Sequence, residues 1–94
     1  MSLMDLETVV HHGGRLNILR CLVDNGDQSV PQLAARTGDP GRAVHYWVRV
    51  LENFDLVKRV GEEGRQRRPI YSASLDGHPE WVRKAVEDHR PRTV

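Results

Sequence analysis

The sequence predicts an α+β fold that is mostly α, with a three-helix core, a two-stranded β-hairpin and one helix flanking each end. Three observations predict it. Apolar residues recur at helical spacing through most of the chain. Two helical segments meet at Gly38-Asp39-Pro40, where a helix-ending residue precedes two helix-starting residues. Short β-branched runs then flank a Gly-bounded turn. The 94 residues suffice for a single domain, residues 1–94, and are too few for two.

The first segment carries an apolar stripe at i, i+3 and i+7, formed by Leu3, Leu6 and Val10. This spacing predicts a short helix over residues 4–12. Gly13-Gly14 follows and is expected to interrupt the helix, because glycine is a poor helix former.

A second helix is predicted over residues 15–24, and it is apolar on several sides. A helix with this pattern is usually central in a fold. Cys21 lies in the apolar run, and we expect it to be buried packing rather than a reactive thiol. As the lone cysteine it cannot form an internal disulfide, so nothing in the sequence requires an oxidising compartment.

The next two helices are predicted over residues 31–37 and 40–54, after a short strand at Gln28-Ser29-Val30. Gly38 suits the end of the first helix, and Asp39 suits the N-cap of the second. A connection of this length forces the two helices to cross steeply, as in a helix-turn-helix.

The helix over residues 40–54 separates into an apolar face and a basic, partly aromatic face. Val44, Val48 and Leu51 fall together at 100° per residue, with Trp47 beside them, and are predicted to face the core. Arginine can fork onto guanine edges or phosphates, and tyrosine can contact a thymine methyl or a phosphate. The opposite face therefore predicts contact with DNA. Its residues are Arg42, His45, Tyr46, Arg49 and Asn53.

A β-hairpin is predicted over residues 56–72, with its turn at residues 61–64. Its basic side chains are expected to hold DNA phosphates, whereas Glu62 and Glu63 would make the turn acidic. The net charge of the chain is only +1, but seven basic and four acidic residues give residues 40–72 a balance of +3. A merely solvated charged face is the alternative interpretation. The expected phosphate-binding residues are Lys58, Arg59, Arg65, Arg67 and Arg68.

A last helix is predicted over residues 79–89, with Trp81 on its apolar face. The chain contains, in order, the stretches G-R-L-N-I-L-R-C-L-V, S-V-P-Q-L-A-A-R-T-G, A-V-H-Y-W-V-R-V-L-E-N-F-D-L-V and P-I-Y-S. Together they resemble winged helix-turn-helix transcription regulators of the ArsR type. The resemblance covers about residues 6–72. Phe54-Asp55 stands where that family often has a small residue and glycine.

The resemblance implies a sequence-specific transcriptional regulator, a repressor, that works as a homodimer. Each helix over residues 40–54 would enter the major groove of one half-site, and the first and last helices would pair the subunits. Trp81 on a short terminal helix fits an interface anchor, although packing on its own subunit is the alternative. The expected interface residues are Leu3, Leu6, Val10, Trp81, Val82 and Ala85.

Metal sensing occurs in the family that the chain resembles, and the sequence matches its ligand patterns incompletely. One family site needs Cys-x-Cys, where this chain has Ser29 and Pro31, which supply no thiolate. A second family site ends in Glu or His, where this chain has Arg92, a cation. A three-ligand zinc site stays an alternative, but we expect no metal and no cofactor. The matching ligands of the second site are Asp76, His78 and His89.

Other functional classes find little support in the sequence. There is no Ser/His/Asp arrangement, phosphate-cradling glycine loop or paired acids in an identifiable cleft, so we do not expect an enzyme. No apolar run approaches ~18 residues, and no secretory signal is visible, so a cytoplasmic location is expected. The competing interpretation is a winged helix that contacts proteins instead of DNA, because a fold does not determine a function.

Overall fold

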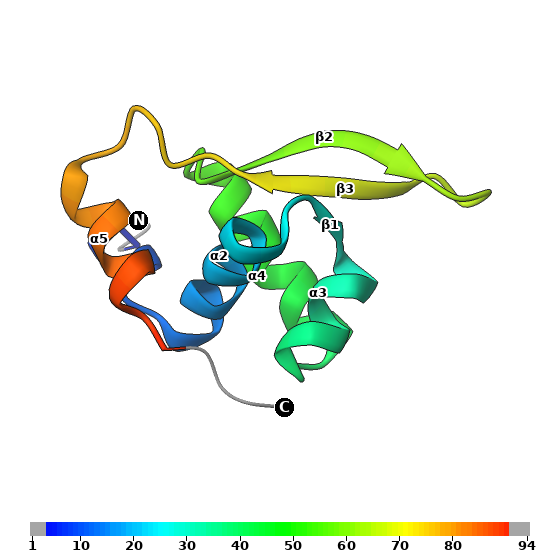
Figure 1. Cartoon of the computed structure of the whole chain (residues 1–94), viewed down its shortest axis with the longest axis horizontal. Helices are drawn as coiled ribbons and strands as arrows, with labels where there is room; N and C mark the ends of the chain where they lie inside the picture. Colours follow the sequence, from blue (N-terminus) through cyan, green and yellow to red (C-terminus); the bar gives the residue numbers. More distant parts are fainter. Residues whose placement is uncertain (1–3, 91–94) are drawn as a thin grey trace.

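The computed structural model describes residues 4–90, which form five helices and a three-stranded antiparallel sheet. Figure 1 shows the helices gathered into one body, from which a long β-hairpin extends to one side. This architecture confirms the predicted fold class. No helix among residues 4–90 is long and apolar enough to cross a membrane. In chain order the elements are α1 (Leu6–Val10), α2 (Gly13–Asn25), β1 (Gln28–Ser29), α3 (Val30–Thr37), α4 (Gly41–Asn53), β2 (Val57–Glu63), β3 (Arg68–Ala73) and α5 (Glu80–Asp88).

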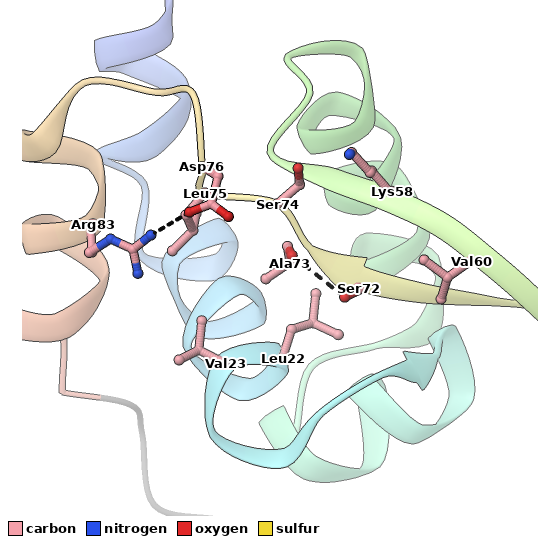
Figure 2. Close-up of a pocket in the computed structure, with 10 residues that line it drawn as sticks. All are labelled: Leu22, Val23, Lys58, Val60, Ser72, Ala73, Ser74, Leu75, Asp76 and Arg83. Atoms are coloured by element: carbon pink, nitrogen blue, oxygen red, sulfur yellow. Dashed lines mark hydrogen bonds and ion pairs between the residues drawn. The ribbon is translucent and has the colours of Figure 1, made fainter.

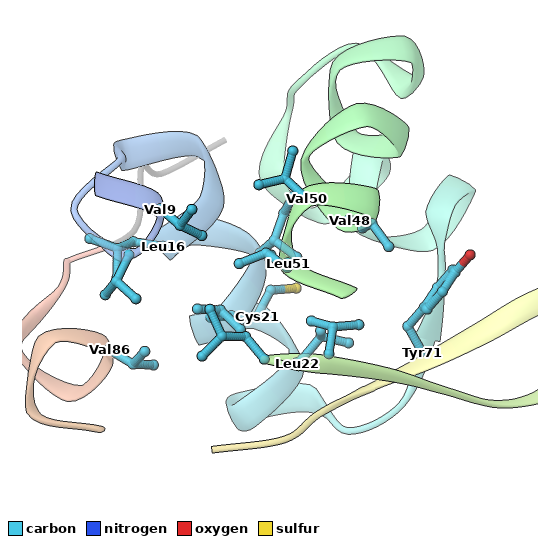
Figure 3. Close-up of a cluster of buried hydrophobic side chains, with 14 of the residues drawn as sticks. Val9, Leu16, Cys21, Leu22, Val48, Val50, Leu51, Tyr71 and Val86 are labelled. Atoms are coloured by element: carbon cyan, nitrogen blue, oxygen red, sulfur yellow. The ribbon is translucent and has the colours of Figure 1, made fainter. Parts of the chain in front are cut away.

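Helix α2 lies at the centre of the body, as its apolar sides predict. Ile18 and Leu19 are fully buried, and the expected burial of Cys21 is confirmed. Figure 3 shows Leu51 of α4 and Val86 of α5 in the same cluster of buried side chains. Close packing of these residues from several helices stabilises the body through removal of apolar surface from water.

The break predicted at Gly13-Gly14 is wrong, because α2 begins at Gly13. His12 is the N-cap of α2, and its Nδ1 accepts a hydrogen bond from the Arg15 N–H at 3.3 Å. Gly14 has a packing reason instead: a Cβ at this position would lie 2.6 to 2.8 Å from ring atoms of Trp47. The glycine therefore lets α4 approach the first turn of α2.

Two arginines of α2 attach the flanking helices to it. Arg15 is buried, and its Nε and Nη2 donate to Val9 O at 2.8 Å and Thr8 O at 3.3 Å, at the C-terminal end of α1. Arg20 Nη1 donates to Val86 O at 3.3 Å, near the C-terminal end of α5. The last carbonyls of a helix lack partners within it, and positive charge is favourable there. Helix α2 therefore holds both flanking helices by the same kind of contact.

The sheet has the strand order β1-β3-β2, so β3 is central. The long hairpin of β2 and β3, called the wing below, pairs from Val57↔Ala73 to Glu63↔Arg68. A β-bulge interrupts the register at Val60. Bulges bend and twist a strand locally, and this one follows directly on the first three paired residues of β2, Val57 to Arg59.

The turn of the wing lies later in the chain than predicted, at residues 64–67 instead of 61–64. Gly61 suggests a turn in the sequence, but it follows the bulge and stays in β2. The chain reverses through Gly64 and Arg67, which have φ angles of 74° and 52°, and the Arg67 N–H donates to Gly64 O at 3.1 Å. The tip of the wing is therefore basic, and the two acidic residues expected there lie on β2.

Candidate nucleic-acid interface

Helices α3 and α4 and the three residues between them form the helix-turn-helix. α3 begins with a capping box, in which Ser29 and Gln32 satisfy each other's backbone N–H groups. It ends at Gly38, as predicted, in a left-handed conformation with a φ of 80°. Pro40 occupies the N-cap of α4 in place of the expected Asp39, and no side chain caps this end. These local signals set where α4 begins relative to α3.

The outward side of α4 is called the recognition face here and consists of the five residues selected from the sequence. All five are exposed, and the Tyr46 side chain is 57% exposed. On the other side Val44 and Leu51 are fully buried. Trp47 is half-buried against the core beside His12, with ring centroids 5.4 Å apart. The predicted separation of the two faces is therefore present. The recognition face consists of Arg42, His45, Tyr46, Arg49 and Asn53.

Tyr71 of β3 is a buried residue of the wing that the sequence did not single out as functional. Tyr71 pairs with Arg59 across the β2–β3 ladder, and its side chain is only 7% exposed. Burial and the nearby Glu52 carboxylate raise the pKa of Tyr71, and the Arg59 and Arg49 guanidinium groups oppose that rise. The Arg49 charge on α4 and the Arg59 charge on β2 therefore both act on the Tyr71 hydroxyl. The sequence signal that could have singled out Tyr71 is an aromatic residue in a strand that begins with basic residues.

Basic side chains at the wing tip are exposed and have no acidic partner. Arg65, Arg67 and Arg68 are all exposed. Within residues 4–90, none of the ion pairs involves them or the arginines of the recognition face. Arg59 differs, because it forms an ion pair with Glu62 at 2.8 Å. Unpaired arginines on an exposed surface leave a positive field for a polyanion.

Lys58 does not join the other predicted phosphate ligands. Side chains alternate between the two sides of a strand, so Lys58 faces away from the side that carries Arg59 and Tyr71. Its cross-strand partner is Ser72, and both line a pocket against α2 and α5. The structure thus places Lys58 on the far side of the sheet from the recognition face. This geometry does not support its assignment to DNA phosphates.

The expected dimer-interface residues divide into two groups. Val10 and Val82 are fully buried in the core of their own subunit, so their side chains offer no surface to a partner, and this part of the prediction is wrong. Trp81 is 37% exposed and stacks on His11 with ring centroids 5.5 Å apart, a contact that the sequence did not predict. Leu6 and Ala85 are half-buried, and Leu3 lies outside the described residues.

The residues of the incomplete metal pattern are engaged in separate contacts. Asp76 forms an ion pair with Arg83 at 2.9 Å. His78 Nε2 bonds Asp55 O at 2.9 Å, and His89 Nε2 bonds Asn17 Oδ1 at 2.6 Å. Among residues 4–90, no group of three or more His, Cys, Asp or Glu side chains could hold a metal ion. Arg92 lies outside the described residues.

Comparison with sequence families decides what the chain is related to. Residues 12–74 match a family model described as HVO_A0114. The chain belongs to the HVO_A0114 family. The HVO_A0114 match covers α2 to β3, which are the helix-turn-helix and the wing. No curated protein matches the chain.

Solved structures share the fold. The transcriptional regulator Tm0710 from Thermotoga maritima is 19% identical and has a TM-score of 0.67, over 83% of this chain and 54% of that one. Reduced HlyU from Vibrio cholerae is 26% identical, with a TM-score of 0.67 over 87% and 78% of the two chains. ZitR from Lactococcus lactis, a zinc-responsive MarR family member, is 17% identical, with a TM-score of 0.65 over 94% and 54%.

These structures support a winged helix-turn-helix fold of the kind found in transcriptional regulators. They do not show the ArsR type, since the family printed for ZitR is MarR. The chain described here spans about half the length of Tm0710 and of ZitR.

Proposed function

We propose that this chain binds duplex DNA in a sequence-specific manner and represses transcription. One observation supports the proposal most: the arginines of the recognition face and of the wing tip are exposed and lack acidic partners among the described residues. DNA binding needs such cations to replace the counterions around the phosphates. The regulator fold shared with Tm0710 agrees with this role.

The two basic surfaces have different roles in the proposal. Arg42, Tyr46 and Arg49 read base edges in the major groove, since arginine forks onto guanine and the first turns of such a helix meet the bases. His45 and Asn53 support them. The wing contacts the backbone, and its basic tip suits the phosphates on either side of a groove. The proposed backbone ligands are Arg59, Arg65, Arg67 and Arg68.

We propose further that the protein acts as a homodimer of the ArsR type, paired through α1 and α5. The surface around Trp81 supports this, because the exposed indole stacks on His11 beside the half-buried Ala85. Large aromatic side chains are common anchors of interfaces. A two-fold dimer would present two recognition helices to two half-sites one helical turn apart.

A winged helix that contacts proteins is the second candidate function. The net charge of +1 and the acidic residues on β2 favour it. The experiment that separates the candidates is a selection from random duplexes with the whole chain. DNA binding predicts an enriched palindrome with a fixed half-site spacing and an affinity that falls as salt rises. No enrichment, and no binding to any duplex at low salt, would favour protein contact.

A further inference from the structure

A pocket of about 390 Å³ lies where the segment after α5 runs past the N-terminal end of α2 (Figure 1). Its lining comes from two segments that are distant in the sequence, residues 13–17 and 89–90. None of the described residues that line it is acidic, so the pocket carries no negative charge of its own. The lining residues are Gly13, Gly14, Asn17, His89 and Arg90.

The most buried side chain of the pocket is Asn17, which is only 6% exposed. Its Oδ1 lies 2.6 Å from His89 Nε2. An amide oxygen can only accept, so the imidazole N–H donates and the Asn17 Nδ2 group is directed away from His89. None of the hydrogen bonds among residues 4–90 uses that Nδ2 group. A donor on a buried side chain is costly without an acceptor, so the Asn17 amide points to an acceptor that binds in the pocket.

Two backbone N–H groups at the start of α2 add to this donor. Gly13 and Gly14 are the first two residues of the helix, where N–H groups have no acceptor within the helix. The His12 cap accepts from the Arg15 N–H at 3.3 Å and therefore leaves the two glycine N–H groups to another acceptor. The aligned peptide dipoles of this 13-residue helix also place a partial positive charge at the same end.

Arg90 supplies one full positive charge to the pocket. It is exposed, and no ion pair within residues 4–90 includes it. The His89 imidazole adds no charge near neutral pH, because burial, and then the Arg20 charge, lower the pKa of His89. One cation beside neutral N–H donors matches the single negative charge of a phosphodiester better than a doubly charged anion.

The pocket lies beside the helix that we propose reads the bases. A Cβ on Gly14 would lie 2.6 to 2.8 Å from ring atoms of Trp47, which directly follows Tyr46 of the recognition face. Burial lowers the pKa of the neighbouring Arg15, and the Tyr46 hydroxyl opposes that shift, so these two side chains interact across α2 and α4. A duplex that contacts Tyr46 would therefore bring its backbone close to the start of α2.

We propose that this pocket binds one phosphodiester group of the DNA backbone, as a third contact besides the recognition face and the wing. The phosphate oxygens accept from the N–H groups of Gly13 and Gly14 and from Asn17 Nδ2, and Arg90 pairs with the charge. Such a contact positions α4 on the duplex without reading its sequence. The contact with DNA rests on the proposed function, whereas the affinity of the pocket for a phosphodiester does not.

Sodium dimethyl phosphate, a singly charged phosphodiester, tests the pocket without DNA. The whole chain is titrated and followed by ¹⁵N–¹H NMR, with sodium chloride at equal ionic strength as the reference. Dimethyl phosphate should move the backbone amide resonances of Gly13 and Gly14 and the side-chain amide resonances of Asn17. Changes at these groups that are no larger than those with sodium chloride would contradict the phosphodiester site.

Two substitutions at Gly13 separate the N–H donor from the rest of the residue. Gly13→Pro removes the N–H at the first position of a helix, where proline is favoured, and His12 before it already has the extended backbone that proline requires. Gly13→Ala keeps the N–H, and its Cβ would meet nothing within 4 Å. Gly13→Pro should bind every duplex about fivefold more weakly than Gly13→Ala, the effect of one lost hydrogen bond. Equal affinities would contradict the role of this N–H.

Arg90→Gln tests the charge at an exposed side chain and does not depend on the folding of Gly13→Pro. It should lower the slope of log K against log salt by about one. Arg83→Gln is the matched control, because it removes the same charge at a second hollow of the surface, where Arg83 pairs with Asp76 at 2.9 Å (Figure 2). Its salt slope should equal that of the wild type. Equal slopes in the two variants would contradict the proposal.

The phosphate itself is identified by replacing single phosphates of the selected duplex with neutral methylphosphonates. One replacement in each half-site should weaken binding by the wild type and have no further effect on Arg90→Gln, because coupled partners do not add. A duplex without any such position would overturn the proposed contact. If the wild type binds no duplex at all, the proposed function fails, and the dimethyl phosphate titration still decides whether the pocket binds a phosphodiester.

Discussion

At the scale of single residues, two glycines of α2 that look alike in the sequence have different surroundings. A Cβ on Gly14 would lie within 2.8 Å of three ring atoms of Trp47, whereas a Cβ on Gly13 would meet nothing within 4 Å. Only the structure distinguishes the two glycines, because Trp47 belongs to α4, which is distant in sequence. Gly14 is therefore a packing requirement between two helices of the body.

Gly14→Ala should destabilise the protein by about 1–3 kcal/mol, the usual cost of forcing extra atoms into a packed site. Gly13→Ala is the matched control and should be neutral or stabilise by up to about 1 kcal/mol, because alanine loses less backbone entropy in a helix. Urea unfolding of the two variants measures the difference. Equal stabilities would show that Trp47 does not lie against Gly14.

Asp55 is a second single residue for which the sequence predicted one feature and missed another. Asp55 stands where the resembled family often has glycine, and it has a φ of 57°, in the left-handed region. Aspartate enters this region more readily than most residues. The sequence indicated an altered turn, but it could not show that the Asp55 carbonyl would accept a bond from His78.

At the scale of the elements, the N-terminal end of α2 depends on a neutral histidine. His12 Nδ1 accepts from the Arg15 N–H, which requires an unprotonated nitrogen. Burial, and then the Arg15 charge, lower the pKa of His12 below its ordinary value of 6.5. The unfolded chain then binds protons more readily than the folded chain. This contribution to stability is complete above about pH 6.5 and is lost as the pH falls through the folded-state pKa.

His12→Asn should reduce the loss of stability between pH 7.5 and pH 5.5, because asparagine is a good N-cap that does not titrate. The measurement is the free energy of unfolding at the two pH values. His89, whose pKa is lowered by burial and then by Arg20, acts in the same direction and remains in the variant. An unchanged pH dependence would show that His12 does not cap α2.

The wing shows which parts of an element the sequence can predict. Alternation and a Gly-bounded turn predicted a hairpin over residues 56–72, and the hairpin exists. The position of its turn was wrong because the bulge at Val60 keeps Gly61 in the ladder. Lys58 and Arg59 are adjacent in the predicted strand and therefore face opposite sides, but the sequence could not show which of the two sides carries the buried Tyr71.

At the scale of the whole molecule, the flanking helices α1 and α5 pack on the core of their own subunit and also carry the proposed dimer interface. Arg15 and Arg20 hold α1 and α5 against α2, and Trp81 remains 37% exposed between the two flanking helices. Periodicity predicted both helices but could not tell Val82, which faces the core, from Trp81. That distinction depends on the angle at which α5 packs on α2.

Trp81→Glu should convert a dimer to a monomer, because a carboxylate replaces the exposed aromatic surface at the proposed interface. Sedimentation equilibrium at micromolar concentration measures the change. Val60→Glu, at a valine that is 52% exposed on the wing, is the matched control and should remain dimeric. A wild-type protein that is monomeric, or a Trp81→Glu variant that stays dimeric, would contradict the proposed interface.

The most direct test of the proposed function is the salt dependence of binding to the selected duplex by the wild type, Arg49→Ala and Arg67→Ala. Arg49→Ala should cost about 1–3 kcal/mol and relax the preference at one base position. Arg67→Ala should weaken binding to all sequences alike and reduce the slope of log K against log salt by about one. Affinity and slope that are unchanged in both variants would contradict DNA binding through the recognition face and the wing.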